Sequence, residues 1–369
     1  MKILYLANAK SVHTKKWVDY FVKNGFKVYV ISLTDAALPG AKVFSLGYKN
    51  IKKEGDFEKI LYFTEIRKIK RLIKKISPDI LHAHYATGYG ISGALSGFHP
   101  YIISVWGSDI FEFPKKSFFH KKLIGFNLKK ADYICSTSHV MAKETKKYTN
   151  KNILITPFGV DCEKFKPASK LKPKDKIIIG TIKALEKKYG IKYLINAFAI
   201  LVKKHSNLPL ELHIGGKGSL ERKLQQLCEN LGIKNKVKFL GYIPHDKVPD
   251  IFNTFSVSVS VSASESESFG VAVIEAEACR IPVVVSDIGG LPEVVQDNVT
   301  GFIVPPKNPE ATAEAIEKLI LDENLRNKMG VAGREFVLKN YEWSKNAKIM
   351  ENLYKTIIRA KSKKLYGEQ

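Results

Sequence analysis

The chain has 369 residues, 45% of them hydrophobic and 26% charged, which is enough for two domains with apolar cores and argues against disorder. Its four cysteines (Cys135, Cys162, Cys228, Cys279) form no C-x-x-C pair and no run of about 18 apolar residues occurs, which argues against a zinc centre, a disulfide framework and a membrane span. The net charge of +24 is uneven, since residues 1–165 hold 28 Lys and Arg against 13 Asp and Glu, and such a surface attracts nucleic acid, anionic lipid or anionic substrates.

Residues 1–165 alternate between short apolar runs and helical patterns, which predicts an α/β domain with a parallel, doubly wound sheet. The expected strands are 3–6, 28–31, 80–83, 101–104, 133–135 and 153–155. The expected helices are 16–23, 57–76, 117–128 and 140–148. Residues 166–175 are polar with two prolines and are predicted to be an interdomain linker.

A second α/β series follows over residues 176–342. The expected strands are 177–180, 211–214, 237–240, 257–261, 283–286 and 302–304. The expected helices are 192–203, 220–231, 247–252, 271–279, 309–321 and 325–340. Residues 343–369 form a tail, in which 343–363 is predicted to be a long amphipathic helix.

Two acids eight positions apart flank the start of a predicted helix. Glu267 precedes Phe269-Gly270, and Glu275 lies about two turns into the helix. Ligands of open α/β sheets bind beyond the carboxyl ends of the strands, where Glu267 is placed. Carboxylates suit vicinal hydroxyls, and the amides of Phe269 and Gly270 suit a phosphate, so together they describe a sugar nucleotide. The alternative is that both acids are ordinary solvated side chains.

Four further motifs occur on either side of these acids: Pro157-Phe-Gly-Val-Asp161 with Phe165, Gly180-Thr-Ile-Lys183 with Lys188, Gly289-Gly-Leu-Pro-Glu293 and Thr300-Gly-Phe-Ile-Val-Pro305. With the two acids of the E-x7-E signature, this ordered set resembles retaining glycosyltransferases of family 4. The resemblance implies the GT-B fold, in which two Rossmann-like doubly wound domains face a cleft and a C-terminal helix crosses back to domain one. It also implies transfer of a hexosyl or N-acetylhexosaminyl group from a UDP- or GDP-sugar, with no metal or other cofactor.

The resemblance assigns donor-side roles in the second domain. Lys183 and Lys188 neutralise the departing diphosphate, although Tyr189 separates Lys188 from Gly190, which leaves Lys187 as an alternative. Glu267 holds the donor sugar and Glu275 the ribose. The donor-binding set is completed by residues of two loops: Ser268, Phe269, Gly270, Gly215 and Gly216.

Candidate acceptor-side residues lie in the first domain. His82 and His84 end a predicted strand and point the same way, so one of them, His84 in our assignment, is a candidate catalytic base. Trp106 stands where the family often has histidine and could form an apolar wall for a sugar. Asp109 could bond a hydroxyl or hold a loop, and His13 lies in the first strand–helix loop.

Two basic segments, 66–76 and 115–130, raise the question of an anionic membrane surface. The alternative for each is a helix that turns its apolar face to the core. The expected acceptor is a lipid-linked compound or a saccharide of cell-surface polysaccharide or glycolipid synthesis. The expected location is the cytoplasm, and attachment to the inner face of the cytoplasmic membrane is kept as an alternative.

Rival hypotheses are a GT-B sugar-nucleotide epimerase, a phosphorolytic enzyme and, more distantly, a polyanion-binding protein. No nucleic-acid-binding motif is recognisable, so nucleic acid is not expected as a partner.

Overall fold

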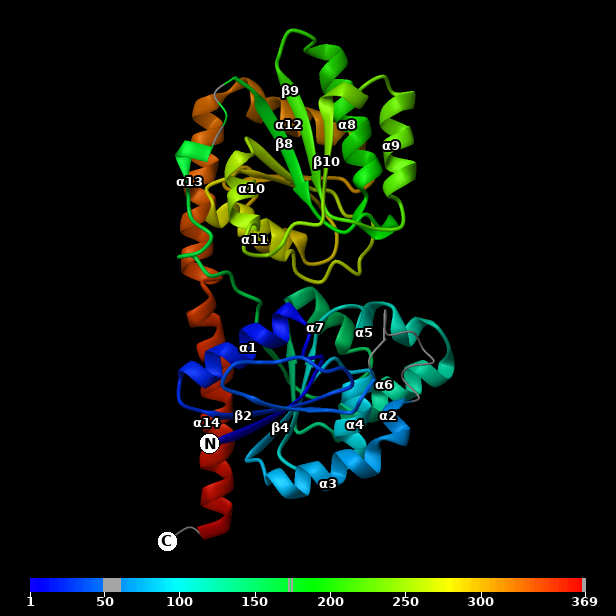
Figure 1. Ribbon diagram of the computed structural model, residues 1–369, viewed down its shortest axis with the longest axis vertical. Coiled ribbons are helices and arrows are strands. Elements are labelled where there is room, and N and C mark those ends of the chain that lie inside the picture. Colours follow the sequence, from blue (N-terminus) through cyan, green and yellow to red (C-terminus); the bar gives the residue numbers. More distant parts are fainter. Residues whose placement is uncertain (49–60, 172, 174, 367–369) are drawn as a thin grey trace. The chain divides into compact units, whose positions relative to one another are not determined.

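The computed structural model describes residues 1–48, 61–171, 173 and 175–366 (Figure 1). Its contacts divide the chain into two units. Unit 1 comprises Met1–Pro157 and Ala347–Gln369, and unit 2 comprises Phe158–Asn346. The sequence placed the end of the first domain at residue 165, whereas residues 158–165 cluster with unit 2.

Unit 1 contains a seven-stranded parallel sheet in the order β3-β2-β1-β4-β5-β6-β7. Its strands are β1 (Lys2–Leu6), β2 (Lys27–Ser32), β3 (Lys42–Ser45), β4 (Ile80–His84), β5 (Tyr101–Val105), β6 (Tyr133–Ser136) and β7 (Ile153–Ile155). Its helices are α1 (Val12–Lys23), α2 (Leu61–Thr64), α3 (Ile66–Ile76), α4 (Gly88–Ser96), α5 (Ser108–Phe111), α6 (Phe118–Lys130) and α7 (His139–Thr145). The strand order reverses between β1 and β4, which is where doubly wound sheets bind ligands.

Unit 2 repeats this architecture with six parallel strands in the order β10-β9-β8-β11-β12-β13. The strands are β8 (Ile177–Ile182), β9 (Leu210–Gly215), β10 (Val237–Gly241), β11 (Val257–Ser260), β12 (Val283–Ser286) and β13 (Gly301–Val304). The helices are α8 (Ile191–Lys204), α9 (Glu221–Asn230), α10 (Val248–Thr254), α11 (Val271–Ala278), α12 (Pro309–Leu321) and α13 (Glu323–Asn340). Here the order reverses between β8 and β11.

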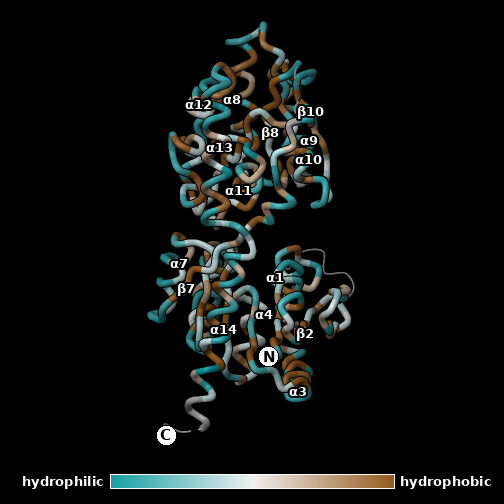
Figure 2. Tube along the Cα trace, turned by 90° about the vertical axis from the view of Figure 1, so that its left-hand side faces the viewer, coloured by the Kyte–Doolittle hydropathy of each residue, from teal (hydrophilic) through white to brown (hydrophobic). Residues whose placement is uncertain are grey.

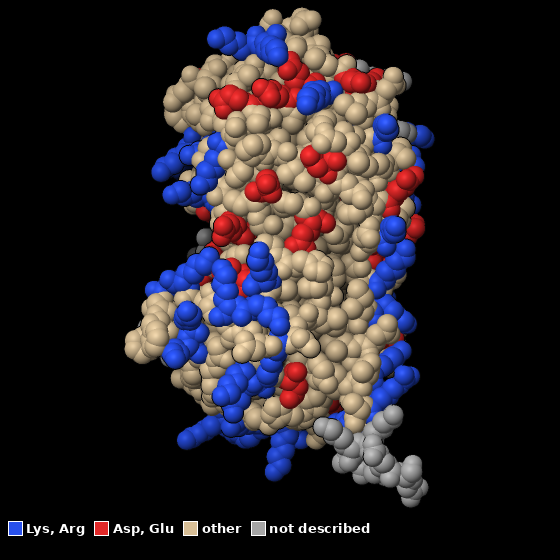
Figure 3. Space-filling model, turned by 180° about the vertical axis from the view of Figure 1, so that it is seen from behind, with Lys and Arg blue, Asp and Glu red and all other residues tan. Residues whose placement is uncertain are grey.

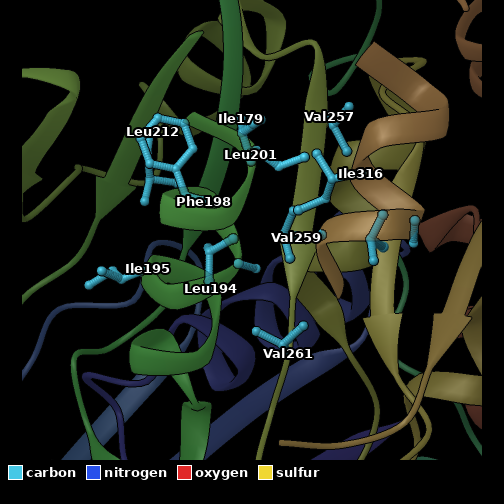
Figure 4. Packing of buried hydrophobic residues seen from close by; sticks show 14 of the residues in the cluster. Ile179, Leu194, Ile195, Phe198, Leu201, Leu212, Val257, Val259, Val261 and Ile316 are labelled. Atoms are coloured by element: carbon cyan, nitrogen blue, oxygen red, sulfur yellow. The ribbon is translucent and has the colours of Figure 1, made fainter. Parts of the chain in front are cut away.

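The core of unit 2 forms where helices lie on the sheet. In α8, the residues Leu194, Phe198 and Leu201 recur at helical spacing and are buried on one face. Figure 4 shows this face packed near side chains of β8, β9 and β11 and near Ile316 of α12. Hydrophobic stretches of the trace run through the interior of each unit, and hydrophilic stretches lie mainly at the periphery (Figure 2). Burial of this kind contributes about 25 cal/mol per Å² of apolar surface.

The last helix, α14 (Trp343–Tyr366), joins the two units along the chain, since its first residues cluster with unit 2 and those from Ala347 onward with unit 1. In unit 1 the Tyr354 hydroxyl lies 2.5 Å from Nδ1 of His82 and 3.1 Å from the Tyr5 hydroxyl. The predicted return of the C-terminal helix to the first domain is therefore confirmed. None of the described helices is both long and apolar enough to cross a membrane.

Most predicted elements are present, with four differences in unit 1. Strand β3, the glycine-rich helix α4 and the short helix α5 were not predicted. The single helix expected over 57–76 is two helices, α2 and α3, that meet at Glu65, and residues 57–60 lie outside the described residues. Residues 166–171 of the predicted linker are tied to α10, because the Asn253 amide bonds the backbone of Lys166 and Ala168.

Candidate active site

Two predicted site residues of unit 2 form an ion pair at the reversal of strand order. Lys183 directly follows β8, and Glu267 lies in the loop after β11. The Lys183 Nζ donates to Oε2 of Glu267 at 2.7 Å, and the side chains are only 13% and 10% exposed. The Ser262 hydroxyl donates to the same oxygen at 3.3 Å. Burial lowers the pKa of Lys183, but the nearby Glu267, Tyr189 and Glu275 outweigh this effect and the pKa is raised overall.

The tyrosine that interrupts the family motif lies beside both candidate phosphate-binding lysines. The ring centroid of Tyr189 is 5.0 Å from Nζ of Lys183 and 5.1 Å from Nζ of Lys188, within the range of cation–π attraction. Lys187 begins the same short 3-10 helix, Lys187–Tyr189, and is exposed. The structure therefore brings Lys188, rather than Lys187, to the ring that Lys183 also contacts.

Glu275 lies on the buried side of α11 and is about 9% exposed. Its Oε1 is 3.5 Å from Nε2 of His245, which follows β10, and His245 Nδ1 lies 3.2 Å from Nζ of Lys164. The charge of Glu275 also contributes to the raised pKa of Lys183, so the two acids of the signature act on one ammonium group. Sequence reasoning missed His245, although a histidine just beyond the carboxyl end of a strand was an available signal.

The loop that carries Glu267 is held by a pair of glycines. The backbone N–H of Gly290 donates to the Glu267 carbonyl at 2.8 Å, and a Cβ at Gly290 would lie 2.4 Å from the Ser268 carbonyl oxygen. Gly289 has φ +58°, and a Cβ there would lie 2.1 Å from the Glu267 carbonyl oxygen. Side chains are excluded at both positions, which explains the Gly-Gly pair of the motif.

Phe269 and Gly270 contribute through the backbone. The Phe269 ring is 3% exposed and packs edge-on against Phe158 and Tyr341, so its side chain belongs to the core. Gly270 precedes α11 with φ 99° and ψ 47°, a left-handed conformation that favours glycine. Their backbone amides lie at the N-terminus of α11, where the helix dipole favours an anion.

Gly215 and Gly216 lie beside the backbone of Lys183. Gly215 ends β9 and its carbonyl accepts the N–H of Lys183 at 2.9 Å. Gly216 has φ +130°, and a Cβ there would lie 1.9 Å from the Lys183 carbonyl oxygen. The glycine turn thus permits a close approach to the lysine loop.

His84 occupies the corresponding edge of unit 1. Its ring centroid is 4.4 Å from that of Trp106, and Trp106 is in turn 5.7 Å from His13. Neither ring nitrogen of His84 has a hydrogen-bond partner among the described residues, and both are buried. Burial, with smaller contributions from the charges of His82 and His13, lowers the pKa of His84 well below its usual value. A depression of about 230 Å³ adjoins this cluster and is lined by Asn8, Ser11, Thr14, His84, Tyr85, Tyr89 and Trp106.

The remaining acceptor-side candidates have structural partners. His82 Nε2 lies 2.8 Å from the Ser104 hydroxyl, which together with the Tyr354 contact fixes the ring between β4, β5 and α14. The Asp109 carboxylate accepts the N–H groups of Ala86, Trp106 and Gly107 at 2.8, 3.2 and 2.8 Å. Of the two roles considered for Asp109, the structure shows the one that holds the loops after β4 and β5. Among the described residues, no group of three or more His, Cys, Asp or Glu is placed to hold a metal ion.

Two parallel doubly wound units, with acids and lysines at the carboxyl edge of the second, define a protein of the GT-B class. Residues 163–336 match the family described as "Glycosyl transferases group 1", and residues 2–138 match "Glycosyl transferase 4-like". The two matches together span most of the chain and support its assignment to the group 1, or family 4, glycosyltransferases, a class of enzymes.

Three similar proteins illustrate the relationship. The N-acetyl-alpha-D-glucosaminyl L-malate synthase of Bacillus anthracis is 27% identical over 79% of this chain and 78% of its own length. The GDP-mannose-dependent alpha-(1-6)-phosphatidylinositol monomannoside mannosyltransferase of Mycolicibacterium smegmatis is 30% identical over 53% of this chain and 55% of its own. The Anabaena HepE structure in complex with UDP and glucose is 19% identical, with a TM-score of 0.78 over 96% of this chain and all of that one, and shares the fold. The chain spans about half the length of several curated relatives that it matches.

Proposed function

We propose that this glycosyltransferase moves a hexosyl or N-acetylhexosaminyl group from a nucleoside-diphosphate sugar to an acceptor hydroxyl. The observation that carries the proposal is the buried Lys183–Glu267 pair, with Lys188 beside it, at the carboxyl edge of the unit 2 sheet. The UDP and glucose named for HepE, and the GDP-mannose named for the mycobacterial relative, support a donor of this chemical class.

In this mechanism the donor is bound by groups of opposite character. The ammonium groups of Lys183 and Lys188, with the amides of Phe269 and Gly270, neutralise the diphosphate as the glycosidic bond breaks. Such preorganised donors stabilise the charge that develops on a leaving group without reorganisation. Glu267 and Glu275 accept hydrogen bonds from the sugar and from the ribose, which orients the anomeric carbon. No metal is assigned a role.

We propose that the anomeric configuration is retained without a covalent enzyme intermediate. Glu267 accepts hydrogen bonds from both Lys183 and Ser262, and these bonds reduce the nucleophilicity of its carboxylate. Attack by the acceptor on the face of the departing diphosphate then accounts for retention. His84 is assigned to the acceptor, because it lines the depression of unit 1 and neither of its ring nitrogens has a hydrogen-bond partner among the described residues, so a ring nitrogen is available to accept a hydrogen bond from the attacking hydroxyl. Trp106 offers an apolar wall for a sugar ring.

The acceptor proposed is a lipid-linked compound or a saccharide used in cell-surface polysaccharide or glycolipid synthesis. The phosphatidylinositol monomannoside in the name of the mycobacterial relative supports the lipid-linked alternative. We place the enzyme in the cytoplasm, where nucleotide sugars are available, at the inner face of the cytoplasmic membrane.

The donor is tested by thermal unfolding of the full chain with a panel of UDP-, GDP- and ADP-sugars. A true donor raises the unfolding temperature, since a ligand at a hundredfold excess over its Kd stabilises the native state by about 2.7 kcal/mol. Product analysis with and without acceptor separates transfer from epimerisation and phosphorolysis. A panel in which no nucleotide sugar shifts the transition would contradict the proposal.

The residues are tested by matched lysine variants. Lys188→Ala should lower turnover by about a hundredfold or more, as loss of a charge-stabilising group does. Glu275→Ala should lower it by a similar factor, because the donor is no longer held in the reactive orientation. Lys187→Ala, which changes the exposed neighbour, serves as the control and should retain turnover. If Lys187→Ala is the inactive variant, the phosphate role belongs to that residue instead.

A further inference from the structure

Helix α6 of unit 1 exposes aromatic side chains to solvent. Its buried face consists of Ile124, Asn127 and Leu128. The opposite side carries Phe118 and Phe119, which are 67% and 81% exposed, and Phe126, which is 39% exposed. Six lysines and no acid lie between residues 115 and 130. Exposed apolar residues ringed by bases are unusual on a surface that has no partner.

Helix α3 provides an internal comparison. It is also strongly basic, but its apolar residues Ile69, Ile73 and Ile76 are buried and only its charged residues face outward. The two basic segments looked alike in sequence, and each could have been a helix with its apolar face in the core. The structure supports that alternative for α3 and contradicts it for the aromatic residues of α6.

The exposed face of α6 borders a depression of about 720 Å³. It is lined by residues of α6 and of the segment that follows α7: Phe118, Lys121, Lys122, Gly125, Phe126, Lys129, Lys146, Lys147, Tyr148, Thr149 and Asn150. None of these lining residues is acidic, and Lys122 and Lys130 lie 5.2 and 5.8 Å from the rings of Phe118 and Phe126. Figure 3 shows Lys and Arg gathered over the flank of unit 1 that carries α6 in Figure 1.

We propose that this face, the α6 face, docks on the surface of an anionic lipid bilayer. Phe118 and Phe119 enter the boundary between headgroups and acyl chains, and Lys121, Lys122 and Lys129 contact headgroup phosphates. Bases and aromatics on one exposed helix face are the pattern of an interfacial helix. A second copy of the chain is a poor partner for this face, because its lysines would meet the same lysines. The inference deepens the proposed function, on which it rests, by naming where a lipid-linked acceptor is approached.

The test is sedimentation of the full chain with phosphatidylcholine vesicles that contain or lack phosphatidylglycerol. Binding should require phosphatidylglycerol and weaken with salt, because exposed charges are screened over about 8 Å at physiological ionic strength. Lys121→Gln with Lys122→Gln should weaken binding about 25-fold, on the basis of the attraction of each lysine near an anionic surface. Phe118→Ser with Phe119→Ser should weaken it at least about tenfold through lost apolar burial.

Lys68→Gln with Arg71→Gln, two exposed bases of α3, is the matched control and should leave binding nearly unchanged. Equal loss in this control, or no loss in the phenylalanine variant, would show general charge attraction and overturn the inference. Failure to bind anionic vesicles would also overturn the inference. This holds whether the chain then proves to be monomeric, to self-associate or to bind an acidic protein through the α6 face. Donor-induced thermal shifts and transfer to a soluble acceptor should be unchanged in all three variants, so failed vesicle binding would leave the proposed function standing.

Discussion

The ion pair between Lys183 and Glu267 should contribute to stability and to catalysis in separable ways. Removal of one partner by Lys183→Met or Glu267→Leu leaves the other charge unpaired in an almost buried position. Breaking a buried pair in this way lowers the free energy of unfolding by about 3–5 kcal/mol. We expect about 3 kcal/mol, the lower end, because the Ser262 hydroxyl still bonds Glu267 and the Tyr189 ring still contacts Lys183. The double variant replaces the pair by apolar side chains and should cost about 1 kcal/mol or less.

Hydrogen–deuterium exchange of the full chain measures this effect for unit 2 by itself. A loss of about 3 kcal/mol speeds amides that exchange by global opening of unit 2 more than a hundredfold. Peptides from β9 should show this in both single variants and not in the double variant, while peptides from β1 of unit 1 act as the internal reference. Additive losses in the double variant would refute the coupling. All three variants should lack transfer activity, and a double variant that recovers it would refute the catalytic role.

Three further perturbations test other parts of the structure by urea unfolding. Gly289→Ala should lower the free energy of unfolding by more than about 3 kcal/mol, because its Cβ would meet the Glu267 carbonyl. Gly232→Ala, at a position with φ +68° but open space, should lower it by about 1 kcal/mol, and equal losses would contradict the close approach at Gly289. Asp109→Ala should destabilise unit 1 by about 3 kcal/mol, since three backbone amides lose their acceptor, and a loss under about 1 kcal/mol would exclude the loop-holding role. Burial raises the pKa of Glu211, but hydrogen bonds from two lysines and a histidine outweigh burial and lower this pKa to about 2. The stability that these bonds add is therefore fully present above the usual pKa of 4.5 and is lost as the pH falls toward 2. Glu211→Gln should therefore cost about 1–3 kcal/mol near pH 7, the lower value reflecting solvent screening of the lysines, and nothing near pH 2; a cost independent of pH would refute this account.

The strands could be predicted from sequence because parallel strands covered on both faces are nearly continuous apolar runs. Strand β3, Lys42–Ser45, escaped because it is a short edge strand with no such run. Helix α4 escaped because three of its nine residues are glycine, which disfavours helix in isolation. Tertiary packing selects those glycines, since a Cβ at Gly93 would lie 2.3 Å from the Tyr101 ring.

The two candidate sites differ in how far the sequence reveals them, and the reason is physical. In unit 2 the site is shaped by backbone: Gly216, Gly270 and Gly289 all have positive φ, and any Cβ would collide with neighbouring atoms. Only glycine satisfies such positions, so this geometry leaves marks that can be read in the sequence. What it leaves unmarked is the side-chain geometry, such as the pairing of Lys183 with Glu267.

In unit 1 the corresponding site is shaped by side chains packed on side chains. His84 is held against Trp106 by ring contacts, and many residue types satisfy a ring contact. Histidine at a strand end therefore indicates little until its neighbours are known, and His82, two residues earlier, proves to be a structural member of the same strand. A sequence thus predicts a binding site best where the main chain shapes it, as in the proposed donor site of unit 2, and least where side-chain packing shapes it, as in the proposed acceptor site of unit 1.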